Sequence, residues 1–261
     1  MATLDYKTFH DEVLDAKELA ESHFSHGQVS MIEENVVYPL RVLHKLTSKG
    51  LLKGSKMLVL NVGSTVFQLF PVCDKYKEIY VMEFTDTNKK HLKLWLNGDE
   101  SAANWTFAAK RVCLFDGNRQ DWKDKEFQVR QAVKGVFLWE DHHTTTIDPK
   151  LVPEVDCVLI TYILNVICKT KEEFLNSLKK SVSRLKAGGH LVMFTPLNMS
   201  YFMVGQHRFF ALSMDEKTVQ ELVISAGLVI EESGLMKSVE KNDMVDFSHV
   251  CYILARWDKT V

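Results

Sequence analysis

Short runs of consecutive apolar residues alternate with amphipathic stretches along most of the chain. The first five runs predict buried β-strands: MLVLNV (57–62), EIYVMEF (78–84), FAAKRVCLF (107–115), VDCVLITYIL (155–164) and HLVMFTPL (190–197). Apolar positions at helical spacing predict helices over 89–97, 126–137, 171–188 and 217–227, and two more strands follow at 228–233 and 248–257. Such alternation indicates the α/β class, here a doubly wound, mostly parallel sheet of seven strands.

The first 50 residues follow a helical pattern instead. The pattern breaks at Gly27, and Pro39 falls inside it, where a proline should kink or restart a helix. No repeat or low-complexity linker interrupts the rest, and the polar segment 141–154 is interpreted as a loop. We therefore expect one domain over 1–261, with an N-terminal helical cap (1–50) on an α/β core (55–261).

Composition narrows the class of protein. Of 261 residues, 46% are hydrophobic, and 32 basic residues balance 34 acidic ones, which argues against a nucleic-acid or membrane surface built on net charge. No apolar run reaches the roughly 18 residues of a membrane span, and the acidic, polar N-terminus is unlike a signal peptide. We expect a cytoplasmic monomer whose protein partner, if it has one, is unknown.

The cysteines and histidines predict no metal or disulfide. The adjacent His142 and His143 occupy a polar loop, which is a weak metal signal. The cysteines are odd in number, widely spaced and mostly set in apolar segments, so we interpret them as buried free thiols. They are Cys73, Cys113, Cys157, Cys168 and Cys251.

Candidate chemistry lies where the predicted strands end, because ligands of open parallel sheets bind at the carboxyl edge. The first strand ends in Asn61 and a small-residue turn, Gly63-Ser64-Thr65. Glu83 ends the second strand at the spacing, about 20 residues on, of an acid that binds ribose hydroxyls. The absence of G-x-G-x-x-G argues against a dinucleotide, whereas S-adenosylmethionine fits. The other strand ends contribute Phe84, Asp116, Thr161, Tyr162 and Thr195.

Several motifs resemble a family of S-adenosylmethionine-dependent N-methyltransferases that act on nicotinamide, indolethylamines and phenylethanolamine. The most specific are FQLFPVCDKYKEIYV, TDTNKKHLKLWL, NW at 104–105, GNR at 117–119, SRLKAGGHLVM and SYFMVGQHRF. The resemblance covers nearly the whole chain. It implies a Rossmann-like class I methyltransferase fold, S-adenosyl-L-methionine as cofactor and a small amine as acceptor.

The resemblance also implies which residues contact the cofactor. Glu83 takes the place of the family's ribose-binding acid, and Asn88 that of the asparagine at the amino acid tail. The implied cofactor-binding set is Gly63, Ser64, Thr65, Glu83, Phe84, Asn88, Glu140, Asp141, Thr161 and Phe24, with Glu140 and Asp141 beside the adenine. The implied substrate pocket is Leu19, Thr195, Met199, Tyr201 and Phe202, with His207 a weaker candidate.

Departures from the family pattern concentrate at one end of the cofactor. The family's first loop reads Asp-x-Gly-x-Gly-Pro-Thr, whereas here Asn61-Val62-Gly63-Ser64-Thr65 lacks two residues. Leu19 and Phe24 stand where the family has tyrosines that bond the cofactor carboxylate. Each lost bond to a charged group costs roughly 1.5–3 kcal/mol, which predicts weakened cofactor binding. Thr195 replaces the acid that faces nicotinamide, so the acceptor should be indolethylamine-like.

Two functions remain open at this stage. The first is an N-methyltransferase for a small aromatic amine, with a degraded cofactor loop. The second is a catalytically inactive descendant that binds a small molecule or a partner, or serves as a structural protein. No catalytic residue stands out, although Glu140 and Asp141 are the loop acids able to take a proton.

Overall fold

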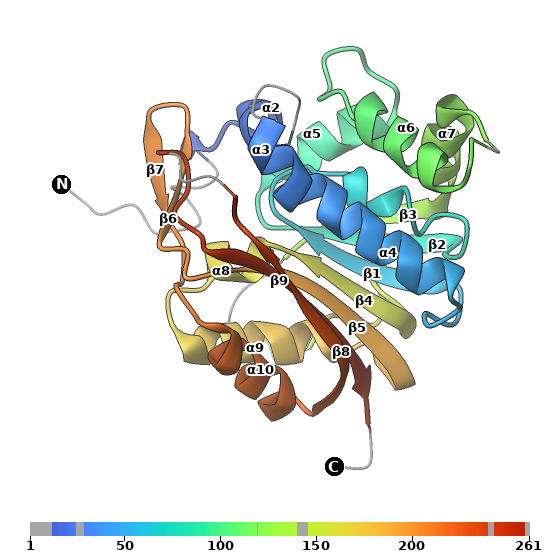
Figure 1. Ribbon diagram of the computed structural model, residues 1–261. Helices are drawn as coiled ribbons and strands as arrows, with labels where there is room; N and C mark the ends of the chain where they lie inside the picture. The colour runs from blue at the N-terminus through green and yellow to red at the C-terminus, as the bar shows by residue number, and fades with distance from the viewer. Residues whose placement is uncertain (1–11, 25–28, 119, 140–145, 240–242, 259–261) are drawn as a thin grey trace.

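A twisted sheet of seven strands forms the centre of the computed structural model, which describes residues 12–24, 29–118, 120–139, 146–239 and 243–258 (Figure 1). The strand order is β3-β2-β1-β4-β5-β9-β8. The strands from β1 to β5 run parallel to one another. At one edge, β9 pairs antiparallel with β5, and β8 pairs antiparallel with β9. Their bounds are β1 Lys56–Asn61, β2 Glu78–Glu83, β3 Val133–Leu138, β4 Val155–Thr161, β5 Leu185–Leu197, β8 Leu228–Lys237 and β9 His249–Trp257. The predicted fold class and strand number are confirmed.

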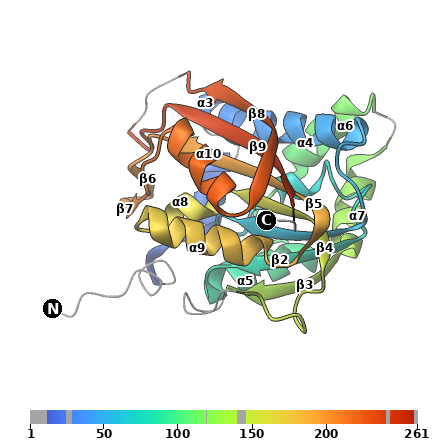
Figure 2. The same cartoon turned by 90° about the horizontal axis from the view of Figure 1, so that it is seen from below.

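Helices cover both faces of this sheet. Figure 1 shows α4, α6 and α7 above one face, and in the view from below (Figure 2) α9 and α10 lie in front of the other. The helix bounds are α2 Ala16–Phe24, α3 Val29–Ile32, α4 Tyr38–Ser48, α5 Asp86–Leu96, α6 Thr106–Phe115, α7 Trp122–Ala132, α8 Ile163–Ile167, α9 Lys171–Val182 and α10 Glu216–Ser225. Two short irregular turns are the π-helix η1, Glu33–Val37, and the 3-10 helix η2, Phe67–Leu69.

The central strands are buried on both faces, as their continuous apolar runs predict. Met57, Leu58 and Val59 of β1 are fully buried, because β1 has β2 on one side and β4 on the other. Asn61 pairs in register with Thr161, so the ends of β1 and β4 lie side by side. This juncture, where the order of strands reverses direction, is the expected ligand site of an open α/β sheet.

The predicted third strand, 107–115, is wrong. These residues form α6, and its buried positions Ala108, Ala109 and Val112 follow helical spacing. The true third strand is β3, which pairs with β2. It includes the last residues of the segment 126–137, which was predicted to be a helix. A short run of mixed small and apolar residues fits both the helical and the strand periodicity, which explains the error.

Other predicted boundaries moved by a few residues. Pro39 falls where the π-helical turn η1 passes into α4, which begins at Tyr38 with the proline in its first turn. The predicted helix 171–188 ends at Val182, and 185–189 belong to β5, where the pairing with β4 shifts register.

A separate two-stranded hairpin, missed from the sequence, lies beyond the end of β5. Its strands are β6, Tyr201–Val204, and β7, His207–Phe210, joined through Gly205 at φ +56°. The hairpin is a sheet of its own, bridged to Val245 through Phe202. It therefore stands outside the seven-stranded sheet, near α2 (Figure 1).

Candidate cofactor and acceptor site

Buried polar atoms without hydrogen-bond partners gather at the carboxyl edge of the sheet. Within the part of the chain that the structure describes, side-chain nitrogen or oxygen atoms of the following residues are buried and unpaired: His23, Asn61, Gln68, Glu83, Asn88, Trp105, Trp139 and Thr161. His190 and Trp257 share the property but belong to β5 and β9. Because folded proteins pair nearly all buried polar groups, such a concentration indicates a ligand site.

Glu83 is the most exceptional of these residues. It ends β2, its side chain is fully buried, and neither carboxyl oxygen has a partner among the described residues. Burial raises the pKa of Glu83 well above its usual value. A carboxyl group held in this way can accept two hydrogen bonds from a vicinal diol, as the sequence analysis expects for ribose.

The first loop is a tight turn whose polar groups bond to one another. Asn61 Nδ2 donates to the Thr65 carbonyl oxygen at 3.0 Å, and Thr65 Oγ1 donates to that of Val62 at 3.2 Å. Gly63 has φ +58°, a conformation that favours glycine. Its Cα faces Leu19, since a Cβ built there would lie 2.7 Å from Leu19 Cδ2. The N-terminal cap is thus packed directly onto the loop.

Phe24, from the end of α2, joins a cluster of aromatic rings beside this loop. Its ring lies 5.7 Å from that of Phe67, 6.4 Å from Trp105 and 6.3 Å from Tyr162. Tyr162 follows β4 with φ +64°, an uncommon conformation for a residue with a side chain. Its hydroxyl donates to the carbonyl oxygen of Asn35 at 3.1 Å, which ties the cap to the end of β4.

A pocket opens between the cap, the strand ends and the hairpin. Its cavity volume is about 50 Å³, and it is partly open to solvent. This is below the range, about 300–1,000 Å³, of small-molecule sites. The residues that line it are Leu19, His23, Phe24, Asn35, Val62, Tyr162, Val166, Pro196, Met199, Phe202, Val245 and Phe247.

Some of the predicted pocket residues line this pocket, and others do not. Leu19, Met199 and Phe202 line this pocket, whereas Tyr201 is half-buried with Arg208 stacked 3.9 Å over its ring. The hydroxyl of Thr195 donates to Asn165 in a buried pair. The weaker candidate His207 is exposed on β7.

The predicted cofactor residues lie around the strand ends where the structure describes them. Ser64, Thr65 and Thr161 are buried there, and Phe84 follows Glu83 into the core. Asn88 lies in the first turn of α5, and its backbone N–H donates to the side chain of Thr85, the helix N-cap, at 3.1 Å. Glu140 and Asp141 lie outside the described residues.

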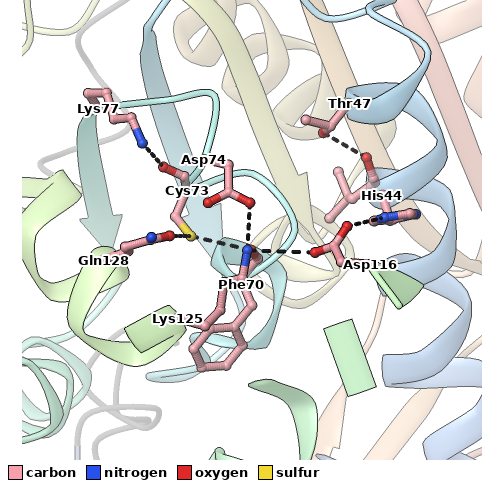
Figure 3. A network of polar contacts seen from close by, with 10 residues as sticks. His44, Thr47, Phe70, Cys73, Asp74, Lys77, Asp116, Lys125 and Gln128 are labelled. Atoms are coloured by element: carbon pink, nitrogen blue, oxygen red, sulfur yellow. Dashed lines mark hydrogen bonds and ion pairs between the residues drawn. The ribbon is translucent and has the colours of Figure 1, made fainter. Parts of the chain in front are cut away.

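Asp116, predicted as a strand-end residue, belongs elsewhere because its strand is a helix. It follows α6 and lies 2.8 Å from His44 Nε2 of α4 and 3.8 Å from the amine of Lys125 (Figure 3). The Lys125 amine also donates to Asp74 at 2.5 Å. Asp116 therefore belongs to a polar network that joins helices, and its assignment to the carboxyl edge is wrong.

Sequence reasoning missed His23 and Asn35 of this region. His23 occupies the apolar face of α2, one residue before Phe24, and this placement could have singled it out. Trp139 follows β3, and its backbone N–H donates to the Glu83 carbonyl oxygen at 2.7 Å. The resemblance implies that the stretch from Trp139 to Asp141 flanks the adenine, and Trp139 is the part of it that lies in the described residues.

The described residues contain neither a metal-binding cluster nor a membrane-spanning helix. No group of three or more histidine, cysteine or acidic side chains is placed to hold a metal ion within those ranges. The helices found in the same ranges are all too short or too polar to cross a membrane.

Comparisons with known proteins agree on one family. The model of the NNMT/PNMT/TEMT family matches residues 3–258. The chain is similar to indolethylamine N-methyltransferase of Oryctolagus cuniculus, with 30% identity over 85% of each chain. It is also similar to nicotinamide N-methyltransferase of Homo sapiens, with 29% identity over 92% of this chain and 91% of that one.

A solved structure supports the architecture. Magnesium protoporphyrin IX methyltransferase from Synechocystis, solved with bound SAM, has a TM-score of 0.58 and 13% identity, over 99% of this chain and 100% of that one. At so low an identity, the likeness shows the fold alone.

Proposed function

The chain belongs to the NNMT/PNMT/TEMT family, and from this membership we propose that it binds S-adenosyl-L-methionine at the carboxyl edge of the sheet and methylates a small aromatic amine. The observation that carries the proposal is the group of unpaired buried polar atoms on Glu83, Asn61, Asn88 and Thr161. These donor and acceptor groups suit the hydroxyl, amine and carboxylate groups of such a cofactor.

The residues present fit this cofactor best at its nucleoside end. Glu83 would hold the ribose diol, and Trp139 beside it would add an apolar wall. Asn88 and Thr161 would serve the amino acid tail. When bound, the cofactor supplies an electrophilic methyl group. The protein's part is to align the acceptor and exclude water, which can account for most of a methyl transfer rate.

The acceptor side favours an indolethylamine-like ligand over nicotinamide. None of the described residues that line the pocket is acidic, so nothing there matches a carboxylate aimed at a carboxamide. Thr195 directs its hydroxyl to Asn165, whose Nδ2 donates to the Leu212 carbonyl oxygen at 3.0 Å. These groups are satisfied within the protein, which leaves an apolar, largely aromatic pocket.

A specific observation favours the second candidate function, a catalytically inactive descendant. Leu19 packs onto Gly63, and Phe24 stacks among aromatic rings, so apolar groups surround the place of the cofactor's charged tail. Desolvating that charge without compensating bonds is costly. The nucleoside end can then persist as a binding site without catalysis.

Calorimetry with S-adenosylmethionine and S-adenosylhomocysteine tests the proposal. We expect binding weaker than about 1 μM, and Glu83→Ala should weaken it by a further factor of roughly 10–100. Glu78→Ala, at the other end of β2, is the matched control and should leave the affinity unchanged. An unaffected Glu83→Ala variant would place the ligand elsewhere.

A variant with a rebuilt first loop distinguishes the two candidate functions. The variant carries Asn61→Asp, a Gly-Pro insertion after Ser64, Leu19→Tyr and Phe24→Tyr. If the loop is degraded, this variant should bind the cofactor more tightly than the natural chain. Methyl transfer to tryptamine by the natural chain supports the enzyme. Binding without transfer, with transfer gained on rebuilding, supports the inactive descendant.

A further inference from the structure

His23 is a buried histidine on the wall of the pocket. It lies in the last turn of α2 and is 4% exposed, and its ring packs edge-on against Phe202 with 6.2 Å between centroids. Its Nε2 is buried and has no hydrogen-bond partner among the described residues. A buried nitrogen left unpaired beside a cavity indicates a contact with whatever fills that cavity.

The surroundings of His23 determine which ring nitrogen carries the proton. Ser22 Oγ lies 2.6 Å from the Glu18 carbonyl oxygen, which can only accept, so the hydroxyl proton points there. The same Oγ lies 2.9 Å from His23 Nδ1 and offers it only lone pairs. Nδ1 must therefore carry the proton, which leaves Nε2 with a bare lone pair.

We propose that His23 Nε2 accepts a hydrogen bond from an N–H group of the acceptor and selects acceptors that have one, an inference that rests on the methyltransferase function proposed above. Burial lowers the pKa of His23 to about 4, so the ring stays neutral at physiological pH. The other described walls of the pocket are mostly aromatic and aliphatic. The chemical class that fits is an apolar aromatic ring bearing an N–H donor.

Two isosteric probes test the assignment directly. Indole carries a ring N–H, and benzofuran replaces it with an oxygen that cannot donate. Calorimetry should show indole bound at least about tenfold more tightly than benzofuran, since a buried acceptor left unpaired is penalised. His23→Phe should abolish the preference. His249→Phe should retain it, because His249 also contacts a serine through Nδ1 but does not line the pocket.

A spectroscopic measurement on the unmodified protein covers the case in which His23→Phe does not fold. Long-range ¹H–¹⁵N correlation spectra should show His23 with a protonated Nδ1 and an unprotonated Nε2. Indole, and not benzofuran, should then shift the Nε2 resonance. A proton on Nε2, equal affinity for the two probes, or no binding of either would overturn the proposal.

These measurements need no cofactor. Failure to bind S-adenosylhomocysteine would overturn the proposed function while the probe experiment still reported on His23. Equal binding of indole and benzofuran would overturn the role of His23 and leave cofactor binding intact. The two failures are therefore distinguishable.

Discussion

The burial of Glu83 lowers the stability of the fold at neutral pH, and the dependence of unfolding on pH separates this effect from its proposed binding role. The unfolded chain ionises this group near its ordinary pKa of 4.5, whereas burial raises the native pKa well above that value. Between the two values the native state binds more protons than the unfolded state, so this group lowers stability as pH rises. A glutamine of the same size carries no such penalty.

We therefore expect Glu83→Gln to unfold at higher denaturant concentration than the natural chain at about pH 7.5. At about pH 4.5 the difference in stability should nearly vanish, and at both pH values the variant should bind the nucleoside more weakly than the natural chain. Glu78→Gln is the control, because the bond from Lys56 lowers the pKa of Glu78 and should give the opposite sign. A destabilised Glu83→Gln at neutral pH would mean that the carboxylate has a partner in the protein.

At the scale of elements, Lys125 connects the helices above the sheet. Its side chain is 1% exposed, and its amine bonds Asp74 and approaches Asp116, which in turn contacts His44 of α4 (Figure 3). Burial lowers the pKa of Lys125, but the bond to Asp74 and the charge interactions with Cys73, Asp74 and Asp116 together outweigh it, and the net pKa is raised. The amine therefore stays charged at neutral pH.

Lys125→Met keeps the aliphatic stem and removes the charge. Since Asp74 is half-exposed and water can solvate it, we expect a loss of about 1–3 kcal/mol in unfolding free energy rather than the larger cost of a fully buried orphan charge. The control is Lys217→Met, which breaks an exposed pair with Glu221 and should cost under about 0.5 kcal/mol. Equal losses in chemical denaturation would show that the Lys125 network adds nothing.

At the scale of the whole molecule, the reactivity of the cysteine thiols measures whether the whole fold unfolds. All five are free and buried, and they come from elements spread through the core. Burial raises the pKa of Cys73, Cys157, Cys168 and Cys251 to about 12, so few thiolates exist at pH 8. We expect the native protein to resist Ellman's reagent and all five thiols to react in denaturant. Rapid reaction of one thiol in native buffer would reveal local opening at its element.

The sequence predicted the sheet more fully than the site, for physical reasons. The runs at 57–62 and 155–164 are apolar, and burial on both faces makes strands of their parts up to Asn61 and Thr161, although the last residues of the second run begin α8. The segment 107–115 satisfies two periodicities, and only packing against its neighbours makes it α6. His23 and Asn35 were missed because their roles depend on contacts between distant elements, which no local pattern records.

The hairpin of β6 and β7 has a consequence for how this protein can diverge. The proposed cofactor contacts arise from strand ends of the central sheet, where substitutions disturb the core. The hairpin contributes Phe202 to the pocket, yet it shares no strand pairing with that sheet. Mutations can accumulate there and alter ligand preference while the fold is preserved. New specificities can therefore evolve on this scaffold through a small, separable module.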